Sequence, residues 1–185
     1  EQLWKQEVEK TLPNQKVIKT IEWAPEDLPK IYSIINEFRR DLWRNDLAII
    51  DWPAPTWMIP TISHWFHPTH TAAKYPQWWP DAIIALTWTE ISDNIEWEWE
   101  DLSFEVTENE DFTLVEFKLD QPQIDLTKTI NTLKSPKIPH WKWVRISWRW
   151  PVAIATALAE SYAHTVPYIA NFQPWVWYVI SISHS

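Results

Sequence analysis

The chain runs Val144-Arg145-Ile146-Ser147-Trp148-Arg149-Trp150-Pro151 immediately before an alanine-rich segment, and this stretch decides its fold. The apolar residues of 144–147 predict a short buried strand. The segment 152–164 predicts a helix that begins beside Pro151, a residue suited to the first helical turn. A strand that leads directly into a helix is typical of α/β sheets with parallel neighbouring strands. The stretch therefore predicts an α/β fold.

Further strands are predicted on both sides of this stretch. Apolar residues that alternate or run together predict strands at 104–107, 112–119, 168–172 and 178–184. Apolar residues near helical spacing predict a helix at 124–133. The second half of the chain thus contains the elements of a small α/β domain.

The first half repeats this order at an offset of about 97 residues. Leu47-Ala48-Ile49-Ile50 falls on the strand that ends at Ser147, and His67 falls on His164. The elements predicted for the first half are a strand at 16–21, a helix at 25–42, a strand at 47–50, a less regular proline-rich segment and a strand at 82–87.

We therefore predict a tandem repeat of two small α/β domains, each with a partly parallel sheet and two helices. Their bounds are 1–98 and 99–185, and the acidic run 90–100 is the natural linker. A coincidence of generic α/β patterning is the alternative.

Length and composition limit the function classes. No apolar run in the 185 residues reaches the roughly 18 to 20 residues of a membrane span, and the first residues lack the blocks of a secretory leader. We expect a soluble, cytoplasmic protein without a membrane partner. The net charge of −9 argues against general binding to DNA or RNA, because that affinity comes mainly from cations. Cysteine is absent, so any metal must be bound by His, Asp or Glu.

The glycine and tryptophan contents of the chain are both abnormal. At average usage the chain would contain about 13 glycines, whereas it has none and has 17 tryptophans. Several of these, such as Trp52 between Asp51 and Pro53, stand in turn contexts where glycine is favoured because it adopts positive φ without a steric cost. We interpret most tryptophan positions as positions suited to glycine. A naturally tryptophan-rich protein, such as a sugar-stacking module, is the alternative, but it leaves the missing glycine unexplained.

The turn between the strand at 144–147 and the following helix is the first candidate site. If its tryptophans mark glycine positions, backbone N–H groups at a helix N-terminus lie beside an arginine, an arrangement that favours a phosphate. The ligand-binding residues predicted here are Ser147, Trp148, Arg149 and Trp150. A plain strand-to-helix turn with a surface arginine is the alternative.

Three histidines of the first half form a second candidate site. His64, His67 and His70 stand at three-residue spacing, and with Asp51 or Asp81 nearby they predict a site for a divalent transition metal. Solvated or locally bonded histidines are the alternative.

The second half contributes two further histidines. His164 ends the predicted helix and is a candidate general acid or base, because an unperturbed imidazole titrates near neutrality. A helix cap is the alternative function of this residue. Ser183 and His184 end the last predicted strand, and ligands bind at strand ends in open parallel sheets.

Four separated motifs of the second half, over about residues 102–185, are similar to one known family. They are Phe112-Thr113-Leu114-Val115-Glu116-Phe117, Trp143 to Pro151 with glycine expected at Trp143, Trp148 and Trp150, Leu158-Ala159 with Tyr162-Ala163-His164-Thr165, and Ser181-Ile182-Ser183-His184-Ser185. They resemble the CRISPR-associated ring nuclease of the manganese-dependent third class.

The resemblance implies an enzyme that binds cyclic tetra-adenylate, the second messenger of type III CRISPR antiviral defence, between assembled subunits and cuts it with manganese. It places the catalytic histidine at His164 and the arginine of the anion turn at Arg149. The family usually has an aspartate at a second catalytic position, where this chain has Gln173 before Pro174. A neutral amide cannot replace a carboxylate as a base.

The resemblance further implies a partner such as cyclic tetra-adenylate or a short RNA, and either a homo-oligomer or a covalent pseudo-dimer. Two alternatives remain open. One is a non-catalytic sensor or sink for a cyclic oligonucleotide, which Gln173 favours. The other is a metal-dependent hydrolase of an unrelated substrate, centred on the three histidines of the first half.

Overall fold

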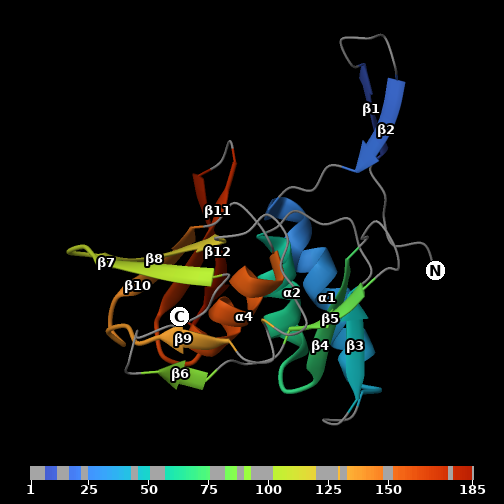
Figure 1. Ribbon diagram of the computed structural model, residues 1–185. Helices are drawn as coiled ribbons and strands as arrows, with labels where there is room; N and C mark the ends of the chain where they lie inside the picture. The colour runs from blue at the N-terminus through green and yellow to red at the C-terminus, as the bar shows by residue number, and fades with distance from the viewer. Residues whose placement is uncertain are drawn as a thin grey trace.

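The protein is a mixed α/β structure, described here from a computed structural model (Figure 1). The described residues are 7–11, 17–21, 25–42, 46–50, 57–75, 82–86, 90–92, 102–119, 129, 133–147, 152–174 and 177–184.

A five-stranded sheet forms most of the second half. Its strands lie in the order β12-β11-β10-β8-β7, and β10 is parallel to both of its neighbours, while the outer pairs are antiparallel. The strands are β7 (Leu102–Glu108), β8 (Phe112–Leu119), β10 (Trp143–Ser147), β11 (Tyr168–Gln173) and β12 (Trp177–Ser183). Helix α4 (Val152–Tyr162) connects β10 to β11. Val144 and Ile146 of β10 are fully buried and alternate with the partly exposed Arg145, so one face of the strand faces the core.

A three-stranded sheet lies in the first half, in the order β3-β4-β5. Its strands are β3 (Leu47–Ile50), β4 (His70–Tyr75) and β5 (Ala82–Ala85), and helix α2 (Met58–Phe66) connects β3 to β4. Helix α1 (Leu28–Arg39) follows a 3-10 turn, η1 (Pro25–Asp27). Two small pairs complete the fold: β1 (Glu7–Thr11) with β2 (Val17–Ile21), and β6 (Glu90–Ser92) with β9 (Lys134–Pro136).

The two larger sheets have the same type of connection between their strands. In each, a strand leads through a helix to a parallel neighbour, β3 to β4 and β10 to β11, and the next strand pairs antiparallel with the second. The bounds correspond closely: β3 ends at Ile50 and β10 at Ser147, while α2 ends at Phe66 and α4 at Tyr162.

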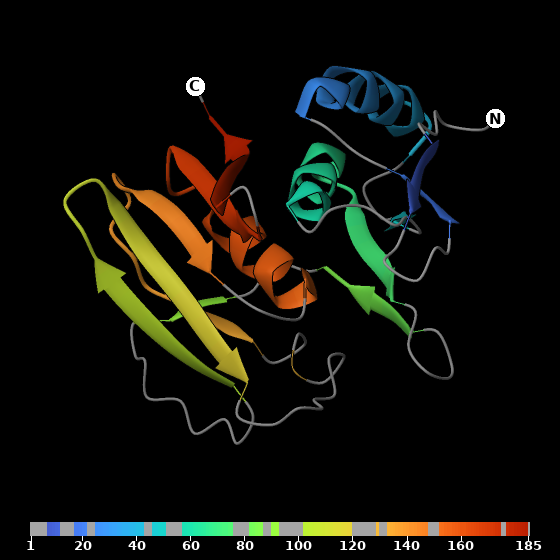
Figure 2. The same cartoon turned by 90° about the horizontal axis from the view of Figure 1, so that it is seen from above.

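The helices α2 and α4 pack against each other between the two sheets (Figure 2). Their buried side chains, which include Met58, Ile62, Ile154 and Leu158, belong to one apolar cluster that continues to the inner face of the five-stranded sheet. Full burial of a side chain such as Leu158 contributes roughly 1.5 to 3 kcal/mol. One core therefore joins the two halves at this helix pair.

The strands predicted at 47–50 and 112–119 have the predicted bounds, and the α/β class is confirmed. The prediction of an irregular proline-rich segment after β3 is wrong, because 58–66 forms α2 and 70–75 forms β4. Pro60 is tolerated since the first N–H groups of a helix have no acceptor within it. Helix α4 ends at Tyr162, before the predicted end. The helix predicted at 124–133 lies almost wholly outside the described residues.

The tryptophan interpretation is confirmed at one position and wrong at others. Trp177 has a φ of 71°, the one positive value among the described residues, and its indole is 74% exposed. Trp57 has a φ of −70° and is buried in the core, and Trp65 lies inside α2 against Tyr32. The backbone conformations at Trp57 and Trp65 therefore do not favour glycine. Trp148 and Trp150 lie outside the described residues.

Candidate functional site

Four histidines gather where α2 meets the ends of α4 and β12. The centroids of the His64 and His184 rings are 5.1 Å apart, and those of His67 and His164 are 5.0 Å apart. Cross contacts close the cluster, at 5.7 Å between His64 and His164 and 5.6 Å between His164 and His184. The cluster therefore joins residues more than one hundred positions apart in the chain.

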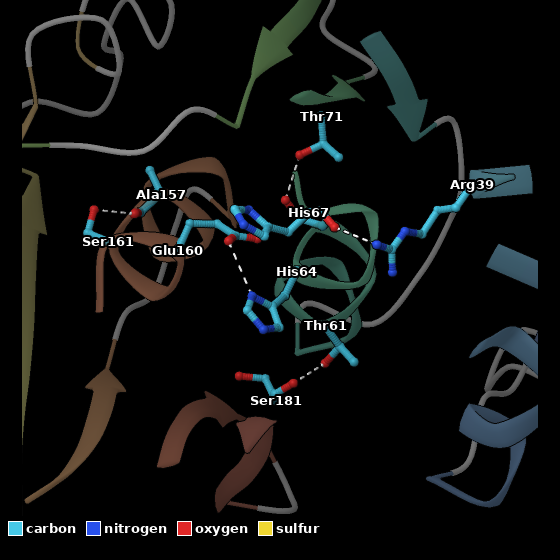
Figure 3. Close-up of polar contacts among 10 residues, drawn as sticks. Arg39, Thr61, His64, His67, Thr71, Ala157, Glu160, Ser161 and Ser181 are labelled. Atoms are coloured by element: carbon cyan, nitrogen blue, oxygen red, sulfur yellow. Dashed lines mark hydrogen bonds and ion pairs between the residues drawn. The ribbon is translucent and has the colours of Figure 1, made fainter. Parts of the chain in front are cut away.

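The first half contributes two imidazoles from the end of α2. His64 lies in its last turn and His67 directly follows it. Arg39 of α1 donates from Nη2 to the backbone oxygen of His67 at 2.8 Å, which holds the end of the helix in place (Figure 3). Thr61 donates from Oγ1 to the backbone oxygen of Ser181 in β12 at 2.8 Å. Hydrogen bonds thus link α2 and the residue that follows it to β12 on one side and to α1 on the other.

The second half contributes two imidazoles from loops. His164 follows the end of α4, where Thr165 donates from both its backbone N–H and its hydroxyl to the backbone oxygen of Tyr162. His184 follows β12 and donates from its backbone nitrogen to the oxygen of Pro167 at 3.1 Å. The side chain of His164 is exposed, so the cluster is open to solvent on this side.

Glu160 adds a carboxylate to the cluster. Its Oε2 lies 3.5 Å from Nδ1 of His64, and the two side chains are 3% and 16% exposed (Figure 3). The other oxygen, Oε1, is buried without a hydrogen-bond partner among the described residues. Nδ1 of His64 is likewise buried without a hydrogen-bond partner among the described residues, so its contact with Oε2 is a charge contact and not a hydrogen bond.

The environment favours neutral imidazoles at two positions. Burial is the largest cause that lowers the pKa of His67, followed by the neighbouring His164. Burial also lowers the pKa of His184, together with His64 and His164, while a hydrogen bond to the backbone of Ala163 opposes the shift. Both groups are thereby suited to accept a proton near neutral pH.

The structure brings only two of the predicted metal ligands into the histidine cluster. His64 and His67 lie in the cluster, whereas the exposed His70 begins β4 and shares none of its ring contacts, and Asp51 lies outside the described residues. Within the part of the chain that the structure describes, no three His, Asp or Glu side chains are arranged to hold a metal ion. The donors as placed do not fit a metal site, and manganese stays a prediction of the resemblance.

Two other predicted residues, Ser147 and Gln173, lie away from the cluster. Ser147 ends β10 and precedes the start of α4, while Trp148, Arg149 and Trp150 lie outside the described residues. Gln173 ends β11, which is parallel to β10, and so lies at the same edge of the sheet as Ser147. The 11 residues of α4 span about 16 Å. Ser147 and the histidine cluster are therefore separated by the length of this helix.

Ser183 and His184 lie on the cluster side of the sheet. The register pairs Ser183 with Tyr168, at the beginning of β11 and far from Gln173. The side chain of Ser183 is exposed beside His184. Of the predicted ligand-binding residues, His184 is thus brought to His164, the predicted catalytic histidine, and Ser183 directly precedes it, while Ser147 lies elsewhere.

Sequence analysis missed Glu160, and it did not connect His64 and His67 with the histidines of the second half. The predicted alignment of His67 with His164 was a signal, because equivalent residues of two copies would meet if they lay near a shared axis. Glu160 gave a weaker signal, as a lone charge in the otherwise apolar and alanine-rich helix.

A search against protein-family models finds no match to this chain. Among the described residues, none of the helices has both the length and the apolar character required to cross a membrane.

Proposed function

We propose that the chain is a tandem pseudo-dimer that binds cyclic oligoadenylate and cleaves it as a ring nuclease. The observation that carries this proposal is the cluster of His64, His67, His164 and His184 between the two halves. Several imidazoles within reach of one another provide both an acceptor and a donor of protons, which phosphodiester cleavage by a ribose hydroxyl requires.

The shared order of elements supports the tandem repeat. The strand, helix, parallel strand and antiparallel strand of 47–85 recur in 143–183. The α2 and α4 helices, which the repeat relates, pack against each other. In this arrangement the chain is a covalent counterpart of a homodimer, with its cluster at the interface of the copies.

The reaction needs no water. The 2′-hydroxyl of one ribose loses its proton to His67 and attacks the adjacent phosphorus, and the bond from phosphorus to the 5′-oxygen breaks. His164 donates a proton to that oxygen. The products are a linear oligonucleotide with a 2′,3′-cyclic phosphate and a free 5′-hydroxyl. The lowered pKa of His67 suits it to the role of base, because its imidazole is neutral near pH 7.

We propose that the ligand binds between two molecules, and the length of α4 supports this. Ser147, the residue before the predicted anion turn, and the histidine cluster belong to opposite ends of this helix in one chain. A second copy arranged head to tail would bring the turn of one molecule to the cluster of the next. This assembly agrees with the expectation from the family resemblance that the ligand is bound between subunits.

The test is cleavage of cyclic tetra-adenylate, with and without manganese, resolved by chromatography. We expect linear products from the native chain and a loss of at least about a hundredfold in H164A and in H67A. His140 is exposed and makes no ring contact with the cluster, so H140A is the matched control and should keep native activity. Absence of cleavage by the native chain under both conditions rejects the enzymatic proposal.

A sensor or sink is the second candidate, and Gln173 at the position of the family's aspartate favours it. Calorimetry separates the two candidates: tight binding of cyclic tetra-adenylate without turnover selects the sink. The third candidate, a metal-dependent hydrolase centred on His64, His67 and His70, requires that H70A lose both bound metal and activity. We expect H70A to retain the native rate, because His70 lies outside the cluster.

A further inference from the structure

His64 and Glu160 stand at equivalent positions of two helices that pack against each other. Each residue lies two positions before the last residue of its helix, which is Phe66 in α2 and Tyr162 in α4. The same offset relates Pro55 to Pro151, which precede the helices in the sequence. The repeat therefore aligns His64 with Glu160.

The two side chains meet across the helix pair. Nδ1 of His64 lies 3.5 Å from Oε2 of Glu160 (Figure 3). Where two copies are related by a two-fold axis, a residue contacts its own equivalent only if both lie beside the axis. His67 and His164, which align at an offset one residue larger, form a second contact of this kind.

We infer that the His64–Glu160 pair marks a pseudo-two-fold axis of the tandem chain, and that Glu160 is a positioning residue for His64. The inference rests on the proposed function and deepens it. It places a carboxylate 3.5 Å from one imidazole of the cluster, a pairing of unlike residues that a symmetric dimer could not have at its axis.

A symmetric homodimer must place identical residues on its axis. Two glutamates there would be two carboxylates in a nearly dry contact, which repel each other. Two histidines would lack a carboxylate that could orient either ring. A single chain that contains both copies can place unlike residues at the axis, and a carboxylate beside Nδ1 leaves Nε2 of His64 for exchange of a proton with substrate.

Packing alone does not account for Glu160. It is the one charged residue of α4, and its Oε1 has no hydrogen-bond partner among the described residues. A buried charge with incomplete partners contributes less stability than an apolar side chain of similar volume. A role at the site explains its place in the helix better than a role in the core.

Exchange of the two residues tests the axis by thermal unfolding. H64E places two carboxylates in contact, and E160H places two imidazoles in contact. Each single variant should lower the Tm, while the double variant H64E/E160H should recover at least half of the summed loss, because equivalent environments receive the exchanged residues. Losses that add in the double variant would overturn the assignment of the axis.

Kinetics test the positioning role. E160Q has nearly the same shape, and it should lower kcat by at least about tenfold while KM for cyclic tetra-adenylate stays within about twofold of native. E160D, which keeps the charge, should recover part of the lost kcat. Glu105, an exposed glutamate paired with Lys118, supplies the control, and E105Q should change neither constant. An E160Q enzyme with native kcat removes the positioning role.

The proposed function and the pseudo-two-fold axis can be rejected independently. If the native chain does not cleave cyclic tetra-adenylate, the proposed function fails, while recovery of the Tm in H64E/E160H still supports the axis. If cleavage is observed but exchange does not recover stability, the function stands and the axis fails.

Discussion

The rings of His67 and His164 lie 5.0 Å apart between centroids, although one residue follows α2 and the other follows α4. The internal alignment places one residue on the other. Their contact forms the centre of a cluster to which each half of the chain contributes two imidazoles. The candidate site is therefore a property of the interface between the halves and is absent from either half alone.

Acidification should destabilise the fold below about pH 6.5. Burial lowers the pKa of both His67 and His184 from the ordinary value of 6.5. Above this value both groups are neutral in the folded and unfolded states and contribute nothing to the pH dependence. As the pH falls through it, the unfolded chain takes up protons first, so stability decreases and levels off only below the lowered folded pKa.

Thermal unfolding between pH 8 and pH 5 measures this effect. In the double variant H67N/H184N, the part of the decrease that begins near pH 6.5 should be smaller than in the native chain. Identical pH profiles for the two proteins would contradict the prediction.

W177G should raise stability. Trp177 has a φ of 71°, and a residue with a Cβ in the left-handed region is disfavoured by roughly 1 to 2 kcal/mol. Its indole is 74% exposed, so glycine removes little packing. Chemical denaturation should show a gain of about 1 kcal/mol. Trp141 is 72% exposed without a positive φ, and W141G should give no gain. A loss of stability in W177G would show that its indole makes a contribution larger than the strain.

Two inactive variants should restore activity when mixed. R149A changes the predicted anion turn and H164A changes the cluster, and in the proposed head-to-tail assembly some sites combine the intact turn of one chain with the intact cluster of another. Random mixing in equal amounts makes about one quarter of the sites intact. Cleavage of cyclic tetra-adenylate by the mixture is the measurement. A mixture as inactive as its components would place both groups in the same chain's site.

T61V should weaken the attachment of α2 to the five-stranded sheet. The buried hydroxyl of Thr61 donates to the backbone oxygen of Ser181 at 2.8 Å. Loss of this donor leaves the oxygen without that bond, so we expect a cost of about 1 to 2 kcal/mol and a Tm lower by several degrees. Thr107 is exposed on β7, and T107V should leave the Tm within about a degree of native. An unchanged Tm in T61V would mean that water or another donor replaces the hydroxyl.

Much of the second half could be predicted from its sequence. Apolar patterning predicts β8 and β10 because their buried residues alternate with more exposed ones. This two-residue period can be recognised in the sequence without knowing which segment packs against the strand. Helix α2 was not predicted, because Pro60 and Pro68 suggested an irregular segment. A proline near the start of a helix has no effect on its hydrogen bonds, and only the backbone shows where that start is.

The sequence by itself determined the α/β class and the strand and helix on either side of Ser147, since each depends on local apolar patterns. The tertiary structure alone decided that α2 and α4 pack together, that Glu160 lies beside His64, and that the cluster and Ser147 belong to opposite ends of one helix. The physical reason is that contacts between distant segments depend on which apolar faces are buried against each other. That packing is determined by all the residues of the core together and not by any local pattern.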